Sequence, residues 1–247
     1  MKFLPTTKEE MKSLGWDSID VLLISGDTYL DTSYNGSALI GKWLVEHGFK
    51  VGIIAQPEVD VPDDITRLGE PNLFFAISGG CVDSMVANYT ATKKRRQQDD
   101  FTPGGENNKR PDRAVLVYSN MIRRFFKGTT KKIVISGIES SLRRITHYDY
   151  WTNKLRKPIL FDAKADILSY GMGEMSMLQL ANALKNGEDW QNIRGLCYLS
   201  KEPKEDYLSL PSHADCLADK DKFIEAFHTF YLNCDPITAK GLCQKCD

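Results

Sequence analysis

Three glycine-rich segments hold the side chains whose types and spacing could support chemistry. The first, residues 25–31, reads Ser-Gly-Asp-Thr-Tyr-Leu-Asp and offers the carboxylate of Asp27 to a ribose hydroxyl or to a proton. The second, residues 78–84, places Gly79 and Gly80 before Cys81, and paired glycines ahead of a helix can form a backbone nest that accepts anions. Neither segment contains Gly-x-Gly-x-x-Gly, and the chain has no Walker A pattern, so dinucleotide binding and P-loop nucleotide hydrolysis are disfavoured.

Residues 136–151 form the third and most polar segment, directly after an apolar run. The segment carries Glu139, Ser141, Arg143, Arg144 and His147, followed by Tyr-Asp-Tyr-Trp. The two guanidinium groups could hold a phosphate or a carboxylate, and the aromatic residues could stack on a ring. The alternative is a loop of structural hydrogen bonds under an aromatic cover. The concentration of functional groups at a strand end favours a site.

The six cysteines offer two further candidates. Cys81 could be a nucleophile, with His147, in a stand-alone hydrolase or transferase, although a single cysteine at a strand end more often packs as a small apolar residue. Cys234, Cys243 and Cys246 contain one Cys-x-x-Cys pair, which is half of a structural zinc site. No familiar spacing completes the four ligands, so a metal site at these three residues is the weaker interpretation and free thiols are expected.

Apolar runs predict the strands that position these segments. Runs at residues 20–25, 51–55, 73–78, 132–136 and 165–169 are typical of strands buried on both faces, and stretches of helical spacing lie between several of them. This alternation predicts an α/β domain with a doubly wound, mostly parallel five-stranded sheet of the Rossmann or flavodoxin type. A helical C-terminal extension with one helix near residues 220–231 follows.

The carboxyl ends of the strands are the expected binding edge, because ligands of open parallel sheets bind there. Gly171 and Gly173 follow the fifth run, and Glu174 opens a predicted helix over residues 174–184. The candidate binding residues at this edge are Asp27, Gly79, Gly80, Glu139, Ser141, Arg143, Arg144, His147, Gly171, Gly173 and Glu174.

Periodicity and charge divide the chain unevenly. Residues 1–185 are expected to form the α/β domain, interrupted by a polar insertion at 92–112, and residues 186–247 are expected to be a linker and a partial segment. Residues 90–160 hold 17 Lys and Arg against 6 Asp and Glu, whereas the remainder holds 15 against 27. A solvated basic face is the simpler interpretation, and a phosphate-rich partner such as RNA is the alternative. No apolar run approaches the length of a membrane span, and no signal peptide is visible, so a cytoplasmic protein without a membrane partner is expected.

Several motifs together resemble one known family. Residues 136–141, with Ala-Asp at 165–166 and Gly-x-Gly-Glu at 171–174, resemble the cobalamin-binding-type domain that precedes many radical-SAM cores. More closely, the chain resembles the N-terminal region of the YgiQ-like radical-SAM proteins. The segments that carry this match are 14–17, 26–29, 52–57, 67–69, 110–114, 137–151 and 163–166.

The resemblance implies an accessory domain whose catalytic core lies elsewhere. Family members hold a [4Fe-4S] cluster and S-adenosylmethionine through a Cys-x3-Cys-x2-Cys motif beyond this region. Ala239 stands where the first cysteine of that motif would precede Cys243, so this chain alone is expected to be inactive. The Asp-x-His-x-x-Gly pattern of base-off cobalamin binders is absent, which disfavours cobalamin. The resemblance therefore implies a domain that binds substrate or a second cofactor beside a core in cis. A tRNA-binding module that uses residues 90–160 is the alternative.

Overall fold

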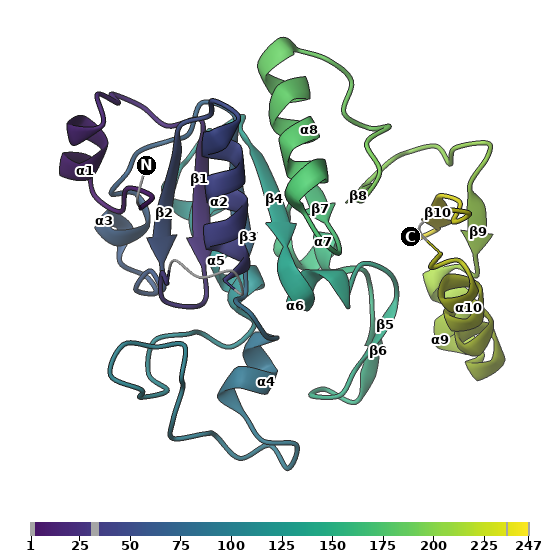
Figure 1. Ribbon diagram of the computed structural model, residues 1–247. Coiled ribbons are helices and arrows are strands. Elements are labelled where there is room, and N and C mark those ends of the chain that lie inside the picture. Colours follow the sequence, from purple (N-terminus) through teal and green to yellow (C-terminus); the bar gives the residue numbers. More distant parts are fainter. Residues whose placement is uncertain (1–2, 31–34, 236, 247) are drawn as a thin grey trace. The chain divides into compact units, whose positions relative to one another are not determined.

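The chain divides into two compact units in the computed structural model, which describes residues 3–30, 35–235 and 237–246 (Figure 1). The first unit comprises Met1–Leu142 and Leu160–Tyr198, and the second comprises Arg143–Ile159 and Leu199–Asp247. This grouping differs from the sequence-based division at residue 185. The first unit extends to residue 198, and residues 143–159 belong with the C-terminal residues.

The first unit is built on a six-stranded sheet in the order β2-β1-β3-β4-β7-β8. The strands are β1 (Val21–Ser25), β2 (Val51–Ala55), β3 (Phe74–Ser78), β4 (Lys132–Ser136), β7 (Ile167–Ser169) and β8 (Leu196–Tyr198). The first five strands in this set are parallel, and β8 pairs antiparallel with β7. The predicted count of five strands was therefore one too low. Strand β8 has only three half-buried residues, so it lacks the continuous apolar run that marks the others.

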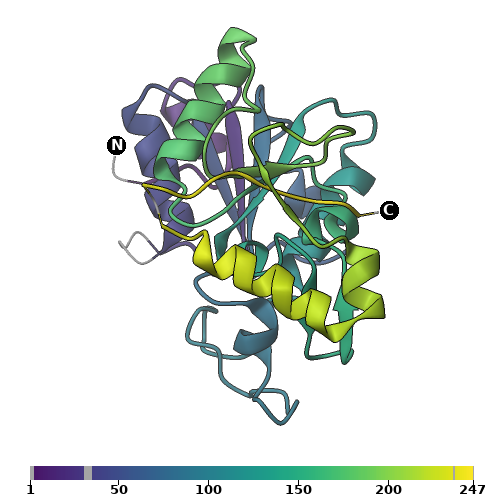
Figure 2. The same cartoon turned by 90° about the vertical axis from the view of Figure 1, so that its right-hand side faces the viewer.

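Helices cover both faces of this sheet (Figures 1 and 2). Alternate strand residues such as Leu23 and Ala76 pack in one cluster with α2 (Gly36–Glu46) and α8 (Glu174–Asn186). Since side chains alternate along a strand, the residues between them face the opposite side, where α5 (Ala114–Phe125) and α3 (Pro62–Ile65) lie. All five residues of β1 are buried, as expected for a parallel strand covered on both faces.

Short helices and a long connection complete the first unit. Helix α1 (Lys8–Ser13) begins with a capping box in which the Thr7 hydroxyl and the Glu10 carboxylate each accept a backbone N–H. Helix α4 (Ser84–Asn88) follows β3, and α6 (Gly137–Ser141) follows β4 directly. Between α4 and α5, the polar insertion contains two isolated bridges, Tyr89–Arg95 and Gln98–Glu106. Helix α7 (Ile159–Ala163) leads into β7.

The second unit combines a hairpin, a two-stranded sheet and two helices. Strands β5 (His147–Asp149) and β6 (Lys154–Arg156) form the antiparallel hairpin, and β9 (Leu208–Leu210) pairs parallel with β10 (Leu242–Gln244). Helices α9 (His213–Ala218) and α10 (Lys220–Leu232) lie between the strands of that pair in sequence. Helix α10 matches the helix predicted near residues 220–231, whereas the strands of this unit were not anticipated.

In the part of the chain that the structure describes, no helix combines the length and the apolar character required to cross a bilayer. The expected cytoplasmic location stays a prediction.

Candidate functional site

Four serines end four neighbouring strands of the sheet and form a row along its carboxyl edge. Ser25 pairs in register with Ser78, and Ser78 with Ser136, while Ser169 ends β7 beside β4. Their hydroxyls contact nearby groups: Gly80 N–H donates to Ser78 Oγ at 3.2 Å, and Ser169 Oγ lies 2.9 Å from Ser176 Oγ. The sequence carried a signal for this row, because four of the five predicted strands end in Ser and a glycine follows within two residues; the run at 51–55, which ends in Ala55, is the exception.

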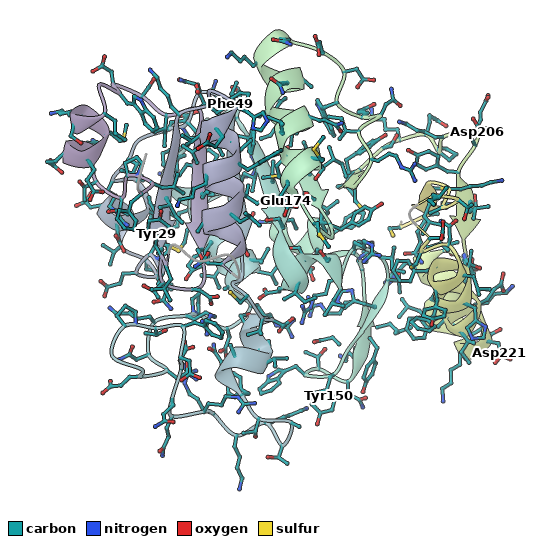
Figure 3. The ribbon with its side chains drawn as sticks, in the orientation of Figure 1. Tyr29, Phe49, Tyr150, Glu174, Asp206 and Asp221 are labelled. Carbon is teal, nitrogen blue, oxygen red and sulfur yellow. The ribbon has the colours of Figure 1, made fainter. Side chains whose placement is uncertain are left out.

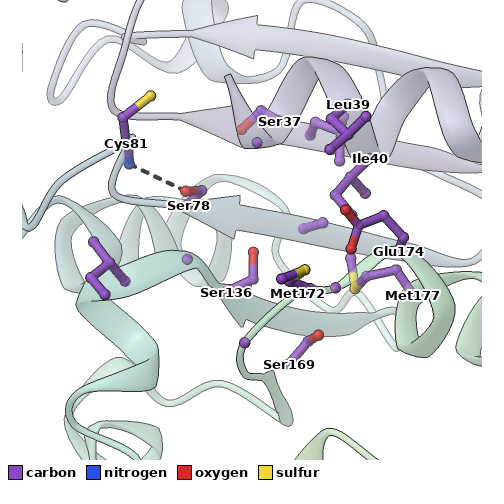
Figure 4. A pocket seen from close by; sticks show the side chains of 18 residues that line it. Ser37, Leu39, Ile40, Ser78, Cys81, Ser136, Ser169, Met172, Glu174 and Met177 are labelled. Atoms are coloured by element: carbon purple, nitrogen blue, oxygen red, sulfur yellow. Dashed lines mark hydrogen bonds between the residues drawn. The ribbon is translucent and has the colours of Figure 1, made fainter. Parts of the chain in front are cut away.

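A cavity of about 230 Å³ opens at this edge (Figure 4). Strands β1, β3, β4 and β7 contribute to its lining, together with the first residues of α2, α6 and α8. The described lining residues are Leu23, Gly36, Ser37, Leu39, Ile40, Ala76, Ser78, Gly80, Cys81, Ser136, Gly137, Ile138, Ser169, Gly171, Met172, Gly173, Glu174 and Met177. Five predicted candidates are therefore near it: Gly80, Gly171, Gly173 and Glu174 line it, and Ser141 Oγ accepts a hydrogen bond from Gly171 N–H at 3.3 Å.

Asp27 fills the glycine nest that was predicted to accept a ligand anion. Its Oδ2 accepts the Cys81 N–H at 2.6 Å, and its side chain is so close to Gly80 that a Cβ at that glycine would overlap Oδ1. Asp27 is only 2% exposed. The backbone donor of the nest is thus already satisfied by a carboxylate of the chain itself.

Arg110 ties the polar insertion to this edge through a buried ion triad. Its guanidinium donates to Asp27 Oδ1 at 2.6 Å and to Asp99 Oδ2 at 2.9 Å, and all three side chains are almost fully buried. Thr102 Oγ1 donates to the same Asp99 Oδ2 at 2.6 Å, and Gln56 Nε2 donates to Thr102 Oγ1 at 2.7 Å. Sequence reasoning placed Arg110 only within a family match and did not identify this role.

Glu139 is also an internal partner, since its carboxylate joins the starts of two helices. Oε2 accepts the Ser84 N–H at the first residue of α4 at 3.0 Å, and Oε1 accepts the Val115 N–H in the first turn of α5 at 3.2 Å. These N–H groups have no partner inside their own helices, so a buried carboxylate satisfies them well. Gly79 passes so close to Glu139 that a Cβ there would overlap Oε2. Glu139 and Gly79 thus pack against each other, and neither lines the cavity.

Cys81 lines the cavity with a thiol that is poorly suited to nucleophilic attack. Burial, together with a hydrogen bond to Asp27 and the negative charge of that carboxylate, raises the pKa of the Cys81 thiol to about 12. A thiol with so high a pKa stays protonated at neutral pH, and the thiolate is the reactive form. The structure therefore disfavours a hydrolase that uses Cys81 as its nucleophile.

The remaining candidates, Arg143, Arg144 and His147, belong to the second unit. The Arg144 guanidinium lies 4.3 Å above the ring of Phe230 on α10, and the Arg143 carbonyl accepts the Ile159 N–H at 2.8 Å. His147 Nδ1 lies 3.1 Å from the Ile145 carbonyl, and burial lowers the pKa of its imidazole. These contacts fix the hairpin segment within its own unit, and binding roles for the three residues stay predictions.

His213 lies in a polar contact that sequence reasoning missed. Thr146 Oγ1 is 3.0 Å from His213 Nδ1, and Thr146 N–H donates to Gln244 Oε1 at 2.8 Å. Burial, followed by the positive charge of Lys157, lowers the pKa of the His213 imidazole. Residues 143–159 are joined in this way to α9 and β10, across separations of 67 and 98 positions.

The described residues contain no group of three His, Cys, Asp or Glu side chains placed to hold a metal ion. Cys234 Sγ instead lies 3.2 Å from the Phe230 carbonyl, and Cys243 Sγ lies 3.3 Å from Ser209 Oγ. Among the described residues, Cys234, Cys243 and Cys246 are thus not gathered into a group that could hold a metal ion. The described cavity lining contains no His, so it does not fit cobalamin ligated through a histidine.

Ion pairs reduce the free positive charge of residues 90–160 and give no support to RNA binding. Arg95 lies 3.7 Å from Asp112, Arg123 lies 2.9 Å from Asp166, and Arg110 is buried between two carboxylates. The stretch is also divided between the two units.

Comparison with protein families and curated proteins gives consistent matches. A family model described as Radical SAM N-terminal matches residues 3–247. A UPF0313 protein of Fusobacterium nucleatum is 95% identical over 247 residues, which is the whole of this chain and 44% of that protein. UPF0313 proteins of Thermotoga neapolitana and Methanocaldococcus jannaschii are 50% and 49% identical, with 43% and 38% of their lengths covered. The chain thus spans less than half the length of these relatives.

Two solved structures share the fold. Both are TsrM, a radical S-adenosylmethionine methyltransferase from Kitasatospora setae, one with tryptophan substrate and a SAM analog and the other with cobalamin and a [4Fe-4S] cluster. Each is 17% identical to this chain with a TM-score of 0.50, and covers 73% or 74% of this chain and 28% of the TsrM chain. At this identity the likeness shows a mixed α/β fold with a mainly parallel sheet.

Proposed function

Because the chain belongs to the Radical SAM N-terminal family, we propose that it is the accessory α/β domain of a radical-SAM enzyme and binds substrate or a second cofactor beside the catalytic core. The rest of the polypeptide would supply that core in cis, since the curated relatives are more than twice as long as the matched stretch. In this proposal the [4Fe-4S] cluster and S-adenosylmethionine belong to that core, and this chain alone does not cleave S-adenosylmethionine.

The position of the cavity is the observation that carries this proposal. The five parallel strands lie in the order β2-β1-β3-β4-β7. Counted by their order in the sequence, this is 2-1-3-4-5, the strand order of flavodoxin-like doubly wound sheets. Strands β2 and β3 flank β1 on opposite sides, so the order switches at β1, and such sheets bind ligands beyond the strand ends at the switch. The cavity is lined by β1 and β3 at this point. This position of the cavity supports the proposal that the domain, with its flavodoxin-like strand order and its resemblance to cobalamin-binding domains, binds a ligand here.

A bound corrinoid is one form that a second cofactor could take, because one TsrM structure has cobalamin bound. The described lining offers hydroxyls, glycine backbone and apolar side chains, but no imidazole. We therefore assign the cavity a general binding role.

Anaerobic reconstitution of the full-length protein tests the proposed function. The protein would be loaded with iron and sulfide, reduced, and supplied with S-adenosylmethionine, and we expect 5′-deoxyadenosine to form. The 247-residue chain treated identically is the matched control and should form none. Failure of the full-length protein to form 5′-deoxyadenosine, although it had bound iron and sulfide, would contradict the proposal.

A further inference from the structure

Carboxylates of the chain itself occupy most of the positive backbone ends along the carboxyl edge; the exception is the start of α2, which is capped by Asn35 and has no acidic residue in its first turn. Asp27 accepts the N–H of Cys81 in the glycine nest, and Glu139 accepts first-turn N–H groups of α4 and α5. Glu174 stands in the first turn of α8, where a negative side chain offsets the positive end of the helix dipole. Anionic ligands of α/β proteins are usually held by such backbone groups. The edge therefore offers an anion little attraction.

The charge of the cavity lining also disfavours an anionic ligand. Apart from the Cys81 thiol, Glu174 is the one ionisable side chain among the described lining residues. The sequence contains no Lys, Arg or His between Tyr29 and Lys42, the stretch that leads into α2. Glu174 is half-buried at the start of α8 (Figure 3), and no hydrogen bond or ion pair joins it to another described residue. A ligand with an N–H donor would satisfy this carboxylate.

The walls of the cavity suit an aromatic ring. Leu39 and Ile138 line it while being 40% and 42% exposed, so apolar surface is available to a ligand. Met172 and Met177 add thioethers, which make favourable contacts with aromatic rings. Gly36 and Gly171 have open space where a Cβ would lie, so a flat molecule can approach their backbone closely. A volume of about 230 Å³ lies below the usual range for drug-sized ligands, so one ring or two fused rings fit best.

We infer that this cavity binds an uncharged nitrogen-bearing aromatic ring whose N–H group donates to Glu174, and that it discriminates against phosphorylated and carboxylated ligands. The inference rests on the proposed function, and it names the ligand class for the same site. It also reverses the expectation from the glycine nest, since the anion that the nest accepts is Asp27.

Four related probes test the inference on the 247-residue chain by titration followed with NMR. Adenine carries the ring and its N–H donors, N6,N6-dimethyladenine lacks the exocyclic donors, and 9-methyladenine lacks the ring N9–H donor. Adenin-9-ylacetate lacks the same ring donor and also carries a negative charge. We expect adenine to bind, at least one of the two methylated analogues to bind about tenfold more weakly, the loss typical of a charge-assisted hydrogen bond, and adenin-9-ylacetate to bind more weakly than 9-methyladenine. Equal affinity for 9-methyladenine and adenin-9-ylacetate, or no shift of cavity resonances with adenine, would overturn the inference.

Two pairs of variants locate the binding. Glu174→Gln should weaken adenine binding about tenfold and reduce the discrimination against adenin-9-ylacetate. Glu46→Gln makes the same change at the exposed far end of α2 and should bind adenine as the wild type does. Ile138→Trp should block the cavity, whereas Leu142→Trp, at an exposed position outside the lining, should not. Wild-type affinity in both Glu174→Gln and Ile138→Trp would overturn the assignment.

The outcomes of this test and of the reconstitution can be separated. If the full-length protein forms 5′-deoxyadenosine but the chain does not bind adenine, the proposed function stands and the inferred ligand class is wrong. If the chain binds adenine through Glu174 but the full-length protein forms no 5′-deoxyadenosine, the ligand class stands and the radical-SAM role is wrong.

Discussion

Arg110 joins segments that are far apart in sequence, since its contact with Asp27 spans 83 positions. Its guanidinium is buried between the carboxylates of Asp27 and Asp99. Among the described residues, neither carboxylate forms an ion pair with a second cation. Forming such a pair costs the hydration of every charge involved, so the net gain in stability is small. Removing one member is different, because the remaining charges stay buried without compensation.

Arg110→Met is therefore expected to lower the free energy of unfolding by about 3–5 kcal/mol, as measured by urea denaturation. Arg124→Met is the control, because the Arg124–Asp60 pair has side chains that are 62% and 67% exposed. Breaking an exposed pair should change stability by only about 0–1 kcal/mol. Similar losses in the two variants would contradict a special role for the buried triad.

His213 should make stability depend on pH between about 7 and 5, because its pKa is lowered in the folded chain. The unfolded chain takes up the proton first as the pH falls, so the free energy of unfolding should decrease over this range. The lowered pKa of His147 acts in the same direction.

His213→Gln should therefore lose less stability than the wild type when thermal unfolding is compared at these two pH values. Thr146→Ser serves as the control, since it keeps a hydroxyl for the contact with the imidazole. A His213→Gln protein with the full wild-type decrease would show that another group is responsible.

Close backbone approach between the ends of β1 and β3 governs the elements at the site. A Cβ at Gly26 would overlap the carbonyl of Gly79, which cannot move without disturbing Glu139. We expect Gly26→Ala to destabilise the protein by about 1–3 kcal/mol, the typical cost of overpacking. Gly36→Ala is the control, because a Cβ there meets open space at the start of α2. Its effect on the urea midpoint should be small, and equal effects would argue against the close approach.

Strands with long apolar runs were predictable, whereas the three-residue strands, apart from β7, were not. Strands β1 to β4 each have five residues that are mostly buried, so their apolar composition alone indicates that they are buried. Strands β8, β9 and β10 have three residues each, and their pairing depends on partners distant in sequence. The edge itself was predictable from where the strands end. The roles of Asp27 and Glu139 were not, because a carboxylate looks the same in sequence whether it faces a ligand or caps a helix 55 positions away.

At the scale of the whole molecule, the first unit is made of two stretches of sequence that flank residues 143–159, and both stretches contribute strands to its sheet. A shortened chain of residues 1–198 keeps all six strands and both helix layers, so it should unfold cooperatively when followed by circular dichroism. A chain of residues 1–158 lacks β7, α8 and β8, which removes Ile167 and Leu180 from the core, and it should not. Cooperative unfolding of the shorter chain, or its absence in the longer one, would contradict this division.

The segment 143–159 also has a particular place in the order of synthesis. It leaves the ribosome before β7, which completes the parallel sheet, and well before His213 and Gln244, which it contacts. The parallel sheet of the first unit can therefore form before the residues that contact this hairpin have been synthesised. A nascent chain paused before residue 213 would expose the hairpin, and protection of Thr146 from hydrogen exchange would begin only after Gln244 has emerged.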